Sequence, residues 1–163
     1  MRQSFIRITV LATAITVLAA LPATAGAATT GGSSPGGATI TIEVGRATLS
    51  QKVVVNVPVT VTCSLNPDAL PEFPQNGTGG GIQIVQANGK SQTSGTSGVP
   101  AFTCDGLPQT FTLQVLADPV SGGLHFKKGA AAIQASAFAF GFDANFNFVM
   151  ATVSTEWIGI STK

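Results

Sequence analysis

The chain has 163 residues, of which 9% are charged, and its eight Lys and Arg side chains nearly balance its seven Asp and Glu side chains. This composition excludes the basic surface that binding to nucleic acid requires. A single His and two cysteines that we expect to be oxidised cannot supply the ligands of a zinc site. We expect no metal and no cofactor.

The segment 1–27 has the pattern of a secretory signal peptide. Two arginines and no acid precede an apolar run at 8–21, and small residues end the segment. Cleavage after Ala25 and cleavage after Ala27 both fit the small-residue pattern. The run of about 14 residues is shorter than the roughly 20 that a membrane-spanning helix needs. We therefore expect a secreted, extracellular protein with no stable membrane insertion after cleavage.

The segment 28–37, ATTGGSSPGG, has no apolar periodicity and predicts a flexible lead-in. The clearest strand follows at 52–63, where valines at every second position alternate with Val, Asn, Pro and Thr and end in Cys63. Pro58 cannot donate a hydrogen bond to a ladder, which predicts a sheet edge or a bulge at that position.

The two cysteines, Cys63 and Cys104, predict a disulfide bond, because an exported chain folds under oxidising conditions. Between them, 64–81 contains three prolines and a run of glycines, which predicts a long irregular loop. Asn88-Gly89 then predicts a tight hairpin turn.

Period-two alternation marks the remaining strands, and no helical apolar period follows the signal segment. The sequence therefore predicts an all-β domain over 38–163, an antiparallel β-sandwich of about eight strands with one disulfide. The further strands that we expect lie at 38–44, 47–50, 82–86, 91–97, 98–104, 109–116, 130–140 and 146–160.

The last two strands predict a hairpin with two unlike faces. With the turn centred on Ala144, one face is Ala- and Val-rich and is the expected core face. The other face is aromatic near the turn and forms a candidate binding patch. The patch comprises Phe138, Phe140, Phe142, Phe146, Phe148 and Met150. Another segment, such as the 64–81 loop, could cover the patch; left exposed, the patch would mark a binding or assembly surface.

No catalytic constellation is present in the sequence. His125 is the single histidine, there is no Tyr, and both cysteines are expected to be oxidised. The one Gly-x-Ser-x-Gly match, at 32–36, falls in the expected flexible lead-in and not in the strand–turn–helix elbow that presents a nucleophile, and no run of acids resembles a calcium loop. We expect a protein that is not an enzyme and has no catalytic residues.

Several features together resemble a known group of proteins. They are the signal segment, the Val/Thr strand ending in Cys63, the second cysteine followed by Asp105-Gly106, and the sequence FKKGAA at 126–131. This pattern resembles small secreted β-sandwich proteins of actinobacterial type, and the pairing of the two cysteines resembles that of immunoglobulin-like domains. The resemblance implies an immunoglobulin-like β-sandwich and an extracellular location, and it assigns no functional residue.

We therefore expect a secreted, non-catalytic β-sandwich that binds an extracellular protein partner or assembles at the cell exterior through the aromatic patch. The alternative is a carrier of an apolar small molecule, in which the same phenylalanines line a cleft. A third possibility is a protease inhibitor that presents 71–74 as a rigid loop.

Overall fold

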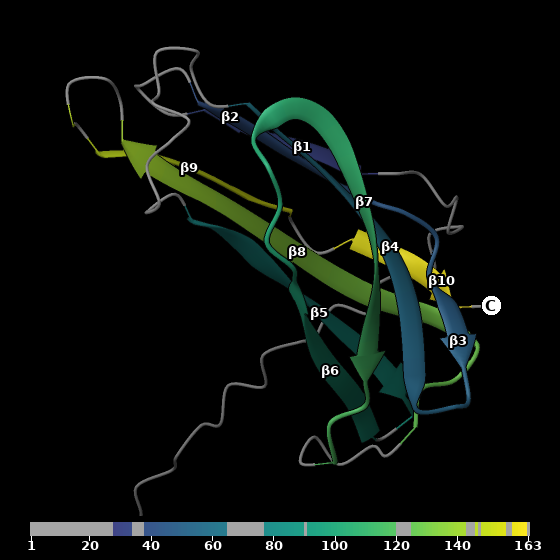
Figure 1. The fold of residues 1–163 in the computed structure, drawn as a ribbon. Coiled ribbons are helices and arrows are strands. Elements are labelled where there is room, and N and C mark those ends of the chain that lie inside the picture. Colours follow the sequence, from purple (N-terminus) through teal and green to yellow (C-terminus); the bar gives the residue numbers. More distant parts are fainter. Residues whose placement is uncertain are drawn as a thin grey trace, which may run out of the picture.

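A computed structural model of the chain describes residues 28–33, 38–64, 77–89, 91–119, 125–142, 146, 148–155 and 158–162. In this part of the chain the regular elements are β-strands (Figure 1). They are β1 (Ala28–Ser33), β2 (Thr39–Val44), β3 (Thr48–Ser50), β4 (Val54–Ser64), β5 (Gly77–Asn88), β6 (Ser91–Val99), β7 (Asp105–Leu116), β8 (Gly129–Phe142), β9 (Phe148–Ser154) and β10 (Ile158–Thr162).

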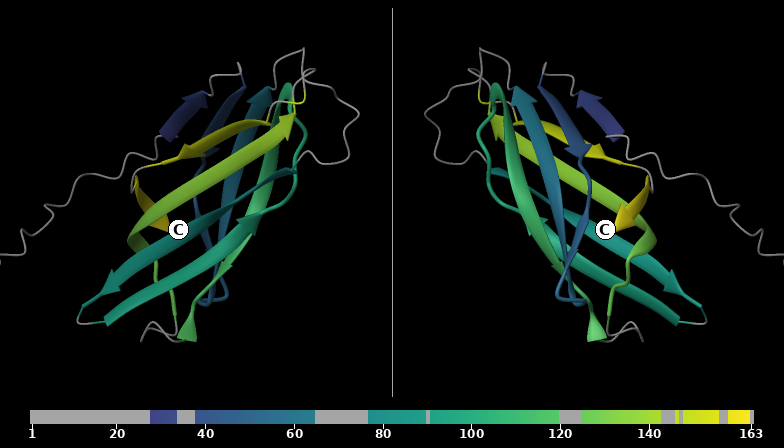
Figure 2. Two further views of the ribbon diagram at one scale, coloured as in Figure 1. Left: turned by 90° about the vertical axis from the view of Figure 1, so that its left-hand side faces the viewer. Right: turned by 90° about the vertical axis from the view of Figure 1, so that its right-hand side faces the viewer.

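The strands form two antiparallel sheets. In the first sheet, β4 lies between β7 on one side and β2 with β3 on the other, and β1 pairs with β2. In the second, β8 lies between β5 on one side and β9 with β10 on the other, and β6 pairs with β5. Because β2 and β3 follow successive parts of β4, and β9 and β10 successive parts of β8, each sheet has four strand positions. Figure 2 shows the two layers face to face. The expected antiparallel sandwich of about eight strands is confirmed.

Alternation in β4 determines which of its residues enter the core. Val55, Val57, Val59, Val61 and Cys63 are fully buried, whereas the residues between them are partly exposed. β-Branched valine suits this position because its branched side chain packs well on a pleated, half-buried surface. The central strand of the first sheet therefore presents a continuous apolar row to the second sheet.

Pro58 lies where the neighbouring strand is interrupted. Its carbonyl oxygen accepts a hydrogen bond from the Gly45 N–H at 2.8 Å, in the gap between β2 and β3. The N–H and C=O of a residue in a strand point to the same side, so the N–H that proline lacks would face this gap. The proline therefore removes no bond from a continuous ladder, which agrees with the expected irregularity.

The core of the second sheet is built on small residues. The inward face of β8 carries Ala131, Ile133, Ala135, Ala137 and Ala139, all at most 8% exposed. Small side chains here leave room for the larger Val and Ile side chains of the facing sheet. Two phenylalanines close the core, Phe102 in the connection to β7 and Phe126 before β8.

One buried amide ties β5 to the segment before β8. Gln86 is 2% exposed, and its Nε2 donates to the carbonyl oxygens of Lys127, at 2.7 Å, and Ala130, at 3.2 Å. Its Oε1 accepts from the Lys127 N–H at 2.7 Å. A buried polar side chain is tolerated when it is satisfied in this way. Gln86 thus holds the start of β8 against β5.

Two segments differ from the sequence-based expectations. Residues 28–33, expected in a flexible lead-in, form β1 and pair with β2 along its whole length. Residues 77–81, expected in a loop because glycine disfavours strands, form the start of β5 and pair with β8. In both segments backbone pairing with an adjacent strand, rather than intrinsic propensity, gives the extended structure. The expected signal peptide, 1–27, and the segment 65–76 lie outside the described residues.

The final hairpin has the expected faces with a different register. Phe140 lies opposite Met150, and Phe142 lies opposite Phe148, so the pairing is shifted by two residues from the expected one. The connection is longer than a turn centred on Ala144. Because side chains alternate with a period of two, a two-residue shift leaves every side chain on its expected face. The long strand expected at 146–160 is divided into β9 and β10 at Thr155.

Candidate functional site: the outer face of the second sheet

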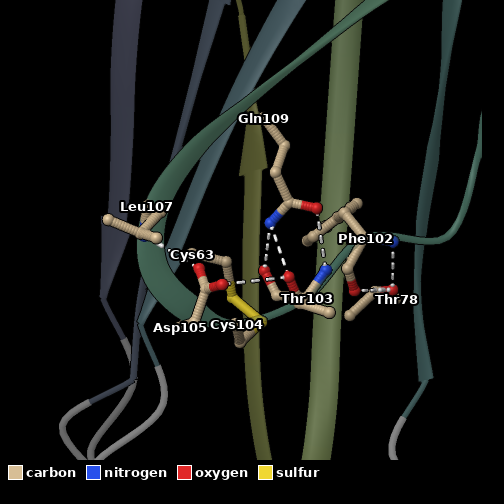
Figure 3. The surroundings of a disulfide bond; sticks show 8 residues. All are labelled: Cys63, Thr78, Phe102, Thr103, Cys104, Asp105, Leu107 and Gln109. Carbon is tan, nitrogen blue, oxygen red and sulfur yellow. Dashed lines mark hydrogen bonds between the residues drawn. A yellow bond between two sulfur atoms is a disulfide. The ribbon is translucent and has the colours of Figure 1, made fainter.

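The disulfide locks one end of the sandwich. Cys63, at the end of β4, is bonded to Cys104, just before β7, as expected (Figure 3). β4 and β7 are neighbours in the first sheet, whereas the disulfide of immunoglobulin domains joins two sheets. The placement of this bridge therefore differs from that of immunoglobulin domains, unlike the expectation from the sequence.

Side-chain hydrogen bonds hold the segment that crosses between the sheets at this end. Thr78 of β5 donates from Oγ1 to the Phe102 carbonyl at 2.6 Å and accepts from the Phe102 N–H at 2.8 Å. On the other side, Gln109 of β7 donates from Nε2 to the Thr103 carbonyl at 2.7 Å and accepts from the Thr103 N–H at 3.1 Å. Figure 3 shows both pairs beside the disulfide. Phe102 and Thr103, just before β7, are therefore held by β5 on one side and by β7 on the other.

The aromatic patch lies on the outer face of the second sheet and is exposed. Phe146 is 65% exposed, Phe148 58%, Met150 47% and Phe138 40%, whereas Phe140 is half-buried. Phe142 is also half-buried. Large apolar side chains gathered on one face of a soluble protein are unusual, because single scattered ones are the norm. Five of the six residues proposed from the sequence therefore lie on one sheet face, whereas Phe146 lies in the connection before β9.

Ring contacts make the patch continuous across β8 and β9. The rings of Phe138 and Phe140 stack with centroids 6.4 Å apart. Phe148 reaches both Phe140, at 5.9 Å, and Phe142, at 5.8 Å in an edge-on arrangement. Aromatic pairs in such geometries stabilise each other by about 0.5–1.5 kcal/mol beyond burial of area. The patch is therefore a pre-ordered cluster and not a set of independent side chains.

Two glycines of β5, Gly77 and Gly79, lie under the rings of Phe140 and Phe138 in β8, and we call these two glycines the glycine shelf. Gly77 pairs with Phe140 and Gly79 with Phe138. A Cβ at Gly79 would lie 3.1 Å from the Phe138 ring, and a Cβ at Gly77 would overlap the Phe140 ring. Rings that cover glycine in a neighbouring strand are a known means of stabilising it. This pairing of glycines with rings was not expected from the sequence, although the spacing of two residues that these glycines share with the phenylalanines could have indicated it.

Substitution of Phe148 by Ser is expected to lower the free energy of unfolding by only about 1 kcal/mol, because the ring is mostly exposed and loses two edge contacts. Substitution of the buried Phe126 by Ala is the control, with an expected loss of about 3–5 kcal/mol. Urea denaturation of both variants measures the difference. A loss of several kcal/mol for Phe148→Ser would mean that another segment covers the patch.

Beside the patch a row of small side chains crosses the sheet. Gly98 lies opposite Gly81, Gly81 opposite Ser136, and Ser136 opposite Ser154, so the row runs from β6 to β9. Larger side chains flank it, with Gln83 and Gln134 on one side and Phe138 on the other. A depression of about 700 Å³ follows this row. We call it the transverse groove.

The outer face of the second sheet carries no charged side chain among the described residues. Side chains alternate between the two faces of a sheet, so in β5, β6, β8 and β9 the residues between the inward-facing ones lie on this outer face. They are Gly77, Gly79, Gly81, Gln83, Val85, Ala87, Gln92, Ser94, Thr96, Gly98, Ala130, Ala132, Gln134, Ser136, Phe138, Phe140, Phe142, Phe148, Met150, Thr152 and Ser154.

Elsewhere, the described residues offer little catalytic or metal-binding geometry. His125 is exposed in the segment before β8. No group of three or more His, Cys, Asp and Glu side chains comes together to hold a metal ion in the part of the chain that the structure describes. Within the same residues, no helix has the length and hydropathy to cross a membrane.

These features define a disulfide-bonded antiparallel β-sandwich with an uncharged, partly aromatic outer face. No protein-family model matches the chain, and neither a curated protein nor a solved structure matches it significantly. The geometry of this face is therefore the basis on which a function can be proposed.

Proposed function

We propose that the protein is a secreted, non-catalytic β-sandwich that binds a protein partner or assembles at the cell exterior through its aromatic patch. The exposure of the phenylalanine cluster on an uncharged face is the observation that carries this proposal. Cores of protein interfaces are depleted of charge and enriched in aromatic residues and Met. The patch has this composition.

The position of the patch supports a binding role. It lies on β8 and β9, beside the start of β5, and at this end Thr78 and the disulfide tie the chain together. A surface held by packed rings and a cross-linked end loses little freedom on binding, which favours affinity. The disulfide also suits an oxidising, extracellular compartment.

The alternative expected from the sequence, a carrier of an apolar small molecule, has less support. It needs the phenylalanines around a cleft, as in apolar ligand pockets that bury most of their ligand. The rings of Phe140 and Phe148 lie on an open sheet face, and the depression beside them is lined by Gly, Ser, Thr and Gln with Ile82 as its one large apolar residue.

The test compares two double variants of the secreted protein. Phe146→Ser with Phe148→Ser removes the two most exposed rings, whereas Leu107→Ser with Leu116→Ser removes two leucines of β7, each above 60% exposed, from the other sheet. Labelled protein is added to washed cells of the producing strain, and sedimentation velocity measures self-association. We expect the phenylalanine variant to lose at least tenfold in cell binding or self-association, and the leucine variant to retain both. Equal behaviour of the two variants would contradict the proposal.

A further inference from the structure

The transverse groove lies beside the aromatic patch and shares no lining residue with it. We propose that the groove is a binding site for a linear, uncharged polysaccharide. Its floor is the row Gly98, Gly81, Ser136 and Ser154, in which every side chain is Gly or Ser. The row crosses four strands, a span of about 14 Å between the outer two at the usual strand spacing.

The shape of the groove suits a polymer. It runs from edge to edge of the sheet, because β6 is the last strand on one side and β9 pairs with β8 on the other. A chain lying in it can extend beyond both ends. Along β8, Gln134 and Phe138 flank Ser136 and are four residues apart. At the usual rise per residue in a strand, their backbones are about 13 Å apart. An extended chain one sugar ring wide fits between side chains at this separation.

The chemistry of the walls suits hydroxyl groups. Gln83 and Gln134 lie side by side on neighbouring strands, and their amides make no side-chain hydrogen bond within the described part of the chain. Each amide offers both a donor and an acceptor, the combination that a sugar hydroxyl can satisfy. Phe138, two residues from Ser136 along β8 and 40% exposed, borders the row on the other side but does not line the depression.

The lack of charged side chains among the described residues of this face indicates the class of ligand. None of the described side chains on this face is charged, so none of them attracts an anionic or a cationic polymer. An extended peptide is a poorer fit, because peptides that add to sheets bond through the backbone of a free edge strand. The groove crosses the face, where the backbone groups of β5 and β8 already pair with each other.

Affinity electrophoresis of the protein, produced from its full-length gene and collected from the medium, tests the proposal. The gels contain one soluble uncharged polysaccharide each, namely dextran, starch, mannan, arabinogalactan, xyloglucan or hydroxyethyl cellulose, and alginate serves as the anionic comparison. We expect at least one uncharged polysaccharide, and not alginate, to retard the protein. Retardation by none of the six, or by alginate alone, would overturn the proposal.

The variant Gly81→Val places a branched side chain on the floor of the groove. A Cβ at Gly81 has its nearest neighbour, the Ser97 carbonyl oxygen, at 3.5 Å, which is an ordinary contact. We expect Gly81→Val to weaken polysaccharide binding at least tenfold. The matched control Thr112→Val, on the exposed face of β7, is expected to bind as the unmodified protein does. A second variant, Gln83→Ala with Gln134→Ala, leaves the groove open and removes only the amides, and we expect the same loss.

Two outcomes separate this proposal from the aromatic interface. Phe148→Ser should retain polysaccharide binding, because Phe148 does not line the groove. If Gly81→Val left polysaccharide binding unchanged and altered only the sedimentation coefficient, the groove would be a contact between copies, and the polysaccharide proposal would fail while an assembly role remained.

Discussion

Replacement of Cys63 and Cys104 by alanine is expected to lower the free energy of unfolding by about 4 kcal/mol, the chain-entropy value for a loop of this length. The bond joins residues 41 positions apart, so its removal frees a long loop in the unfolded chain. The loop includes all of β5 and β6, which belong to the other sheet. Urea denaturation of the protein and the double variant measures the difference.

Reduction provides the control for this prediction. The unmodified protein in excess dithiothreitol should unfold at the same urea concentration as the double variant in the absence of reductant. If the double variant lost less than about 1 kcal/mol, the loop-entropy account would be wrong for this protein.

The substitution Gly95→Ala is expected to cost about 3 kcal/mol, the upper range for an added atom in a packed interior. Gly95 lies in β6 at the point where this strand approaches β7 of the other sheet. A Cβ there would overlap the Leu116 carbonyl oxygen and lie 2.9 Å from Val115 Cγ1. The Asp118 N–H donates to the Ser94 carbonyl at 2.7 Å beside it, so the two backbones cannot easily separate.

Gly98→Ala, in the same strand, is the matched control. Its added Cβ has no atom nearer than 3.9 Å, and the backbone is not left-handed there. We expect a gain of about 0.5 kcal/mol, because alanine loses less conformational freedom on folding than glycine. Thermal unfolding of both variants gives the comparison, and equal stabilities would show that β6 and β7 can move apart.

The sequence predicts those parts of the fold in which the pattern of side chains indicates which residues are buried. The valines of β4 and the Ala-rich inner face of β8 alternate with polar or exposed residues, and this alternation matched their burial. The disulfide was predicted because the chain has two cysteines and was expected in an oxidising, extracellular compartment. Period two also placed the aromatic patch on the correct face, even though the hairpin register differed by two residues.

The parts that were missed carry little side-chain information. The segment GTGGG at the start of β5 reads as a loop, because glycine neither favours a strand nor shows which face is buried. β1, ATTGGS, is equally poor in apolar residues. The transverse groove depends on which small residues lie opposite each other on four strands, and only the register supplies that.

The glycine shelf under the rings of Phe138 and Phe140 has a consequence for mapping this surface by alanine scanning. At Gly77 alanine adds an atom where the Phe140 ring already lies, and at Gly79 it adds one 3.1 Å from the Phe138 ring, so the first ring must move and the second must shift slightly. Both positions would then score as interaction hot spots, although neither offers a side chain to a partner. Double-mutant cycles that combine each glycine substitution with removal of its ring would separate these indirect effects from true contacts.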